Sequence, residues 1–200
     1  MTIPCDKFPN ISPMTYSKIR GDIRAGDILL CSGNGLFSSL IKRATQSVWS
    51  HVAFILPIPL IDRIMVLESV ETIGVRTVPL SSYVRDYCGS GKPYDGRFII
   101  ARHDDFKETN VKHLSQCAVD LFGYPYGWTE IARIAGRVAL WWAIKSEALR
   151  QSGNGYICSE YAYECFQSVG ISICHDQRGF VAPADFARDP KIKAVFSILN

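Results

Sequence analysis

The chain has 200 residues, of which 48% are hydrophobic, and its formal net charge is +3. A chain of this length buries about 70% of its surface on folding, so its core needs no disulfide or metal. The positive charges are scattered rather than gathered in a basic run, which argues against nucleic acid as a partner. We therefore expect a single domain over residues 1–200.

The cysteines and the apolar segments limit the chemistry and the compartment. The seven cysteines stand at positions 5, 31, 88, 117, 158, 165 and 174. Their number is odd and none forms a C-x-x-C pair, so we expect reduced thiols, no structural zinc and no cofactor. The chain starts without a signal-peptide pattern and has no apolar run of about 18 residues. We expect synthesis in the cytoplasm, with a non-Sec route if the protein is exported.

The first third of the chain alternates between strand and helix signals. Residues 1–20 contain three prolines and little periodicity, which predicts an irregular N-terminal arm. The apolar run at 28–31 predicts a buried strand. The next segment predicts a helix, because apolar side chains recur at helical spacing in Leu36, Phe37, Leu40, Ile41 and Ala44.

Two predicted strands carry one titratable residue each. Residues 50–56 alternate so that His51 shares a face with Ala53 and Ile55. A lone histidine in a strand is more often structural than catalytic, so both interpretations stay open here. Residues 64–70 form the next strand, with Glu68 among apolar neighbours. A carboxylate in such a place is costly without a partner, which predicts a cationic or N–H-bearing neighbour.

The rest of the chain predicts more helix than strand. Strands are expected at 74–79 and 97–101 around a polar surface loop, a helix at 108–122, an apolar helical elaboration at 129–150, helices from 158 and near 183, and a last strand at 194–199. His103 and His113 are weak catalytic candidates.

Cys158 lies where a glycine-containing loop turns into an amphipathic helix. In the first turn, unpaired N–H groups and the positive end of the helix dipole favour a thiolate. The alternative is that Cys158 is a small buried hydrophobe, as most free cysteines are. The nucleophile interpretation gains weight from the other two residues: adjacent antiparallel strands can bring His51 and Glu68 onto one face. A thiol, an imidazole and a carboxylate together form a Cys-His-acid site.

The segments GDILLCSGNGLFSSLIKRAT, WSHVAF, VLES and YICSEYAYECF occur in this order. They resemble the circularly permuted branch of the NlpC-type papain-like enzymes, the YiiX/YaeF-like permuted amidases. The resemblance runs from about residue 26 to 188 and implies His51 as base, Glu68 as orienting residue and Cys158 as nucleophile. FGYPYG is similar to a segment that precedes the cysteine in NlpC-type enzymes, which would place Tyr126 near the site.

The resemblance implies an α+β fold, in which a small antiparallel β-barrel-like sheet packs against a helical half. It also implies hydrolysis of an amide through a thioester, with a peptidoglycan-type peptide or cell-wall fragment as the favoured substrate. Two alternatives remain open: a lipid-directed acyltransferase or lipase of the lecithin-retinol acyltransferase kind, and a non-enzymatic module that binds lipid or peptide. The sequence does not give the oligomeric state.

The run from Val138 to Ile144 is apolar on all sides and contains Trp141 and Trp142. A helix buried on one face should not be apolar all round, so part of this surface should meet something else. The two tryptophans are either core residues or part of the substrate groove, where a membrane interface or acyl chain would contact them.

Overall fold

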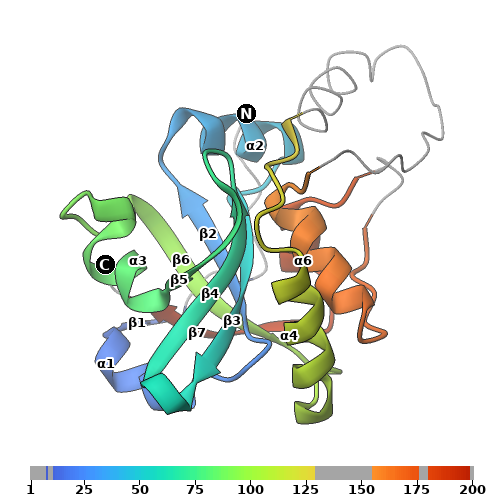
Figure 1. The fold of residues 1–200 in the computed structure, drawn as a ribbon. Helices are drawn as coiled ribbons and strands as arrows, with labels where there is room; N and C mark the ends of the chain where they lie inside the picture. Colours follow the sequence, from blue (N-terminus) through green and yellow to red (C-terminus); the bar gives the residue numbers. More distant parts are fainter. Residues whose placement is uncertain (1–7, 9–10, 129–154, 176–179, 199–200) are drawn as a thin grey trace.

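A computed structural model describes residues 8, 11–128, 155–175 and 180–198 (Figure 1). Its centre is a seven-stranded sheet in the order β1-β7-β6-β2-β3-β4-β5, antiparallel except for the β1/β7 pair. The strands are β1 (Pro13–Met14), β2 (Ile28–Gly33), β3 (His51–Ile58), β4 (Arg63–Val70), β5 (Gly74–Pro79), β6 (Gly96–His103) and β7 (Ile192–Ile198). The predicted α+β class and the predicted strands are confirmed.

Helices lie on both sides of this sheet (Figure 1). On one side are α4 (Val111–Asp120), α6 (Cys158–Gln167) and α7 (Pro183–Arg188); on the other are α1 (Tyr16–Ile19) and α3 (Leu80–Arg85). The helix α2 (Leu36–Thr45) follows β2. Short 3₁₀ turns complete the described elements: η1 (Arg20–Asp22), η2 (Pro59–Ile61), η3 (Tyr87–Gly89) and η4 (Glu108–Asn110).

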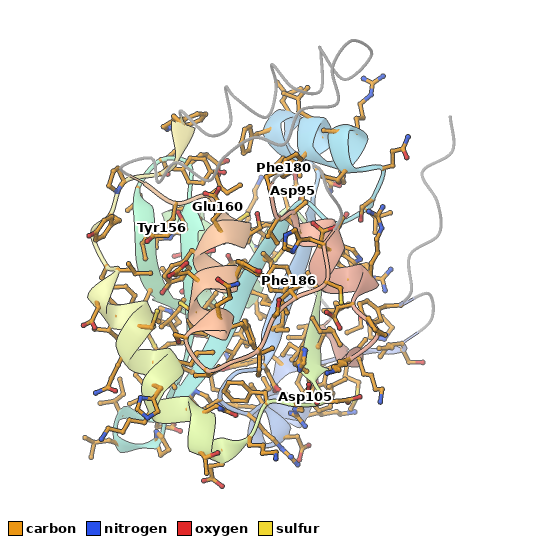
Figure 2. The ribbon with its side chains drawn as sticks, turned by 90° about the vertical axis from the view of Figure 1, so that its right-hand side faces the viewer. Asp95, Asp105, Tyr156, Glu160, Phe180 and Phe186 are labelled. Atoms are coloured by element: carbon orange, nitrogen blue, oxygen red, sulfur yellow. The ribbon has the colours of Figure 1, made fainter. Side chains whose placement is uncertain are left out.

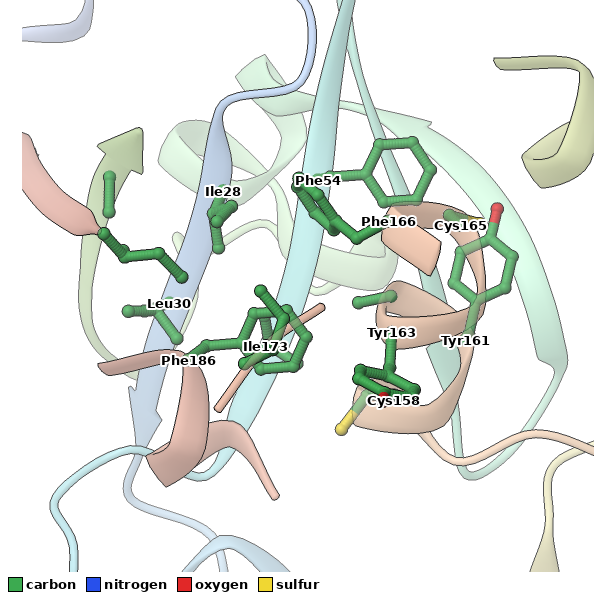
Figure 3. Packing of buried hydrophobic residues seen from close by; sticks show 14 of the residues in the cluster. Ile28, Leu30, Phe54, Cys158, Tyr161, Tyr163, Cys165, Phe166, Ile173 and Phe186 are labelled. Atoms are coloured by element: carbon green, nitrogen blue, oxygen red, sulfur yellow. The ribbon is translucent and has the colours of Figure 1, made fainter. Parts of the chain in front are cut away.

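The alternation along the central strands divides their side chains between two apolar cores. In β3, Val52 and Phe54 join the core under α4, α6 and α7, whereas Ala53 and Ile55 join the core with α1 and α3. Phe54 stacks on Tyr161 of α6, with ring centroids 5.7 Å apart. Figure 3 shows Phe54 beside Phe166, a pair that is edge-on at 6.5 Å. Because successive strand residues face opposite ways, each strand serves both cores.

Three details differ from the expectations. The described part of the predicted arm contains β1 and α1, because residues 13 and 14 add to the edge of the sheet beside β7. The polar loop after β5 begins with α3, whose Leu80 and Tyr83 are fully buried. In α2, the apolar stripe is only partly covered: Leu36 is 89% exposed and Leu40 is 64% exposed, whereas Phe37, Ile41 and Ala44 are half-buried. Periodicity shows that a helix has an apolar face but not whether that face is covered.

Residues 129–154, which include the predicted apolar helix with Trp141 and Trp142, lie outside the described residues. None of the helices in the described ranges has the length and apolar character needed to cross a membrane.

Substitution of a buried and of an exposed apolar residue should change the stability by different amounts. Phe166→Ala should lower the free energy of unfolding by about 3 to 5 kcal/mol, because it opens a cavity in a closely packed aromatic cluster. Leu36→Ala should change the free energy by no more than about 0.5 kcal/mol, since the side chain is in solvent. Urea denaturation of both variants measures this. Equal losses would show that α2 is covered in solution.

Candidate active site

Cys158 opens helix α6, and the chain just before it is held in place by two other segments. Tyr156 N–H donates to the Pro125 carbonyl at 3.0 Å, and Ser69 of β4 donates to the Tyr156 carbonyl at 2.6 Å. A Cβ at Gly155 would lie 2.5 Å from the Pro125 carbonyl oxygen, so only glycine lets the segments around residues 125 and 155 approach this closely. The loop therefore fixes where the helix, and with it the cysteine, begins.

The first turn of α6 is closed by its own side chains. Glu160 accepts from Ile157 N–H at 3.3 Å, and the buried Ser159 hydroxyl donates to the Val181 carbonyl at 2.7 Å. Tyr156 and Glu160 mark this end of the helix in Figure 2. Cys158 itself is 4% exposed. The predicted position of the thiol, in the first turn of an amphipathic helix, is confirmed.

His51 and Glu68 are hydrogen-bonded. His51 begins β3 and Glu68 lies in the antiparallel neighbour β4; Nε2 of the imidazole is 2.8 Å from Oε2 of the carboxylate. Glu68 has no exposed surface, and the His51 side chain is 15% exposed. The structure thus brings the two residues together as the strand alternation predicted.

His51 also contacts the cysteine. Burial works to lower the pKa of His51, but the charge of a Cys158 thiolate, a hydrogen bond with Cys158 and the Glu68 carboxylate together raise the pKa to about 10. The imidazole is thus hydrogen-bonded to Glu68 through Nε2 and interacts electrostatically with Cys158. An imidazolium stabilised from both sides is the state that pairs with a thiolate nucleophile.

The Glu68 carboxylate has two further partners that the sequence analysis did not name. Arg76 of β5, which lies directly opposite Glu68 in the sheet register, donates to Oε1 from Nε at 2.9 Å. The buried Tyr83 hydroxyl of α3 donates to Oε2. Burial opposes ionisation, but His51, then Arg76 and Tyr83, hold the pKa of Glu68 below its usual value. The expected cationic neighbour of Glu68 is therefore Arg76.

A sequence signal for Arg76 existed. The turn between β4 and β5 pairs Val70 with Gly74, and antiparallel pairing outward from that turn sets residue 68 opposite residue 76. No comparable local signal pointed to Tyr83, because α3 reaches Glu68 only through the folding of the segment after β5.

Tyr126 lies near the nucleophile. It is 7% exposed and forms an isolated bridge with Tyr156, two residues before Cys158. Burial, followed by the charge of Cys158, raises the pKa of Tyr126, which keeps its hydroxyl protonated. Its ring is edge-on to Trp128, with centroids 5.3 Å apart, and to Phe37 of α2, at 6.4 Å. The aromatic trio of Phe37, Tyr126 and Trp128 therefore borders the site.

The other histidines lie elsewhere. His103 is buried against Phe166, towards the far end of α6, and burial lowers the pKa of its imidazole. Its Nδ1 accepts from the N–H of Asp105, which Figure 2 places at the opposite end of the molecule from Tyr156. His113 is exposed on α4. In the described part of the chain, no three His, Cys, Asp or Glu side chains gather in a way that could hold a metal ion.

A comparison with protein families matches residues 22–133, more than half of the chain, to the family described as permuted papain-like amidase enzymes, YaeF/YiiX, C92 family. The chain belongs to this family. The matched range contains His51, Glu68 and Arg76 and ends before Cys158. The match supports cysteine-type amidase or peptidase chemistry at the level of the family.

A solved structure gives the same fold. The crystal structure of metalloprotein yiiX from Escherichia coli O157:H7 is similar with a TM-score of 0.63 and 16% identity, over 89% of this chain and 99% of that one. The predicted permuted papain-like fold is confirmed. The search among curated proteins found no match.

The hydrogen-bonded chain predicts the titration of His51. Its imidazole should stay protonated through neutral pH, with a pKa of about 10. Because this pKa lies above the 6.5 of an ordinary histidine, the stabilisation is complete below pH 6.5 and is lost as the pH rises towards 10. Nitrogen-15 NMR of the imidazole measures the titration.

Glu68→Gln should lower the pKa of His51, since the amide can accept a hydrogen bond but carries no charge. Glu71→Gln, which changes a carboxylate at the strand end, is the matched control and should leave the pKa of His51 unchanged. An equal pKa of His51 in both variants would contradict the assignment of Glu68 to the site.

Proposed function

We propose that the chain is a thiol-dependent amidase in which Cys158 is the nucleophile, His51 the acid and base, and Glu68 the orienting carboxylate. The observation that carries the proposal is the hydrogen bond between His51 and the buried Glu68, together with the position of Cys158 at the start of a helix, where its charge raises the pKa of His51. The family to which the chain belongs supports this class of chemistry.

The reaction follows from the positions of these groups. The Cys158 thiolate attacks the amide carbonyl, and the His51 imidazolium protonates the leaving amine as the thioester forms. Water then attacks the thioester, with neutral His51 accepting its proton. Glu68 keeps the imidazole ring in place and stabilises its charged form. No step is routed through a metal.

The start of α6 supplies a candidate oxyanion hole. N–H groups in the first turn of a helix have no acceptor within that helix, and Cys158 is the first helical residue. In the proposed mechanism the Cys158 N–H donates to the oxygen of the tetrahedral intermediate. Tyr126, protonated and close to the cysteine, contributes to substrate binding.

The substrate favoured by the proposal is a peptide amide of the peptidoglycan kind, as a wall fragment or after export of the enzyme. The second candidate is a lipid-directed acyltransferase. One observation favours it: Leu36, Leu40 and Trp128 are more than half exposed. Trp128 also contacts the other two members of the aromatic trio, Phe37 and Tyr126. Exposed apolar side chains at a site entrance suit an acyl chain.

Limited labelling tests the nucleophile. At pH 6 to 7, iodoacetamide should alkylate Cys158 faster than the other cysteines, and His51→Ala should remove the advantage. Cys117 is the competing thiol, because a hydrogen bond with Cys165 outweighs burial and lowers its pKa to about 7. Mapping is therefore done in the Cys117→Ala background as well. Slow labelling of Cys158 in both backgrounds would contradict the assignment.

Product analysis separates the two substrate classes. A muropeptide-type peptide should be cleaved to give a new amine and a new carboxylate, and Cys158→Ser should abolish this. Leu36→Ala should leave peptide cleavage unchanged. Transfer of an acyl chain from phospholipid vesicles, together with its loss in Leu36→Ala, would favour the acyltransferase. If unlabelled enzyme with a reactive Cys158 turned over neither substrate, only a binding role would remain.

A further inference from the structure

Arg76 makes the closest charged contact with Glu68 on the side away from His51. Its Nε and Nη2 lie 2.9 and 2.8 Å from the same oxygen, Oε1. The other oxygen, Oε2, accepts from His51 and Tyr83. The two oxygens are thus assigned to different partners, and the carboxylate cannot rotate away from His51 without breaking its contacts with Arg76.

The groups around Arg76 and Glu68 come from five elements. Besides His51 on β3 and Cys158 on α6, they are Cys31 on β2, Tyr83 on α3, and Tyr87 and Cys88 on η3. Burial raises the pKa values of Cys31, Tyr83 and Tyr87, so these three are neutral at physiological pH. Cys88 accepts a long contact of 3.7 Å from Nη2 of Arg76.

The charges that remain in the proposed ion-pair state balance. Arg76 and the His51 imidazolium are positive, whereas Glu68 and the Cys158 thiolate are negative. A buried cluster of charges is tolerated when it is paired and hydrogen-bonded, and it recruits or releases a proton when it is not. Without Arg76 the cluster would carry a net negative charge in a buried place.

We propose that Arg76 is a positioning residue of this site: it fixes the Glu68 carboxylate towards His51 and supplies the positive charge that lets the Cys158 thiolate form. This role rests on the proposed function and deepens it. In the described part of the chain, Arg76 makes no hydrogen bond with the Cys158 sulfur; it acts by holding Glu68 and, independently of that contact, through its own positive charge. Removing its charge raises the proton affinity of the whole cluster, so the thiolate forms only at a higher pH.

The test is the pH dependence of Cys158 alkylation in three variants. Arg76→Gln keeps an N–H donor for Oε1 but removes the charge. Arg76→Lys keeps the charge but loses the contact of two nitrogens with Oε1. Arg102→Gln is the matched control, because Arg102 of β6 likewise makes two contacts with a buried carboxylate, that of Asp27, at 2.6 and 2.8 Å, and this carboxylate is no partner of His51.

Arg76→Gln should move the midpoint of the alkylation profile upward by about one pH unit, which is a roughly tenfold slower reaction at pH 6. Arg76→Lys should keep the midpoint near that of the wild type. Arg102→Gln should leave it unchanged even if it destabilises the fold as much. A purely structural role of Arg76 would not move this midpoint in a folded variant.

A folded Arg76→Gln variant with the wild-type profile would overturn the proposal. Should that variant not fold, the comparison is made in the Glu68→Gln background, where removal of Arg76 leaves no buried carboxylate unpaired. The double variant should alkylate with a higher midpoint than Glu68→Gln alone, and equal midpoints would overturn the proposal. Failure of the proposed function looks different: wild-type Cys158 would then show no enhanced alkylation at any pH below 8.

Discussion

The site depends on one carboxylate that has no contact with water. Glu68 lies in β4, beside the edge strand β5, in a sheet that carries an apolar core on each face. An ionised carboxylate is tolerated there only because each oxygen accepts hydrogen bonds, and its donors come from three separate elements: β3, β5 and α3. The register of β3, β4 and β5 and the placement of α3 thus all depend on contacts with Glu68. A shift of one residue in β4 would turn Glu68 to the opposite face.

The same arrangement connects the sheet with the nucleophile helix. Ser69, the neighbour of Glu68, points to the other face and holds the Tyr156 carbonyl, two residues before Cys158. Strand alternation therefore lets consecutive residues of β4 perform different tasks: one orients the imidazole and the next positions the loop that leads to the thiol. Contacts of β4 with His51 and with Tyr156 therefore place His51 relative to Cys158, although a long chain segment separates these two residues in sequence.

The border of the site is aromatic, whereas its interior is charged. Phe37, Tyr126 and Trp128 contact one another beside the cysteine, and α2 presents leucines to solvent next to them. In the proposed mechanism the charged interior determines the reaction, because it stabilises an imidazolium next to a thiolate. The apolar border determines which molecules approach, so amidase and acyltransferase proposals share the same three central residues and differ only in what this border binds.

The sequence by itself determined the strands from β2 to β7 and the helix that starts at Cys158, because these follow from local periodicity, and strand alternation allowed His51 and Glu68 to share a face. It also predicted a cationic or N–H-bearing partner for Glu68, since a buried charge requires one. Only the tertiary structure added β1 to the sheet, showed that His51, Arg76 and Tyr83 all bind Glu68, and showed that Leu36 and Leu40 of α2 face solvent. Periodicity records which face of an element is apolar, whereas the neighbour that covers that face, or the donor that reaches a buried oxygen, depends on how distant segments pack together.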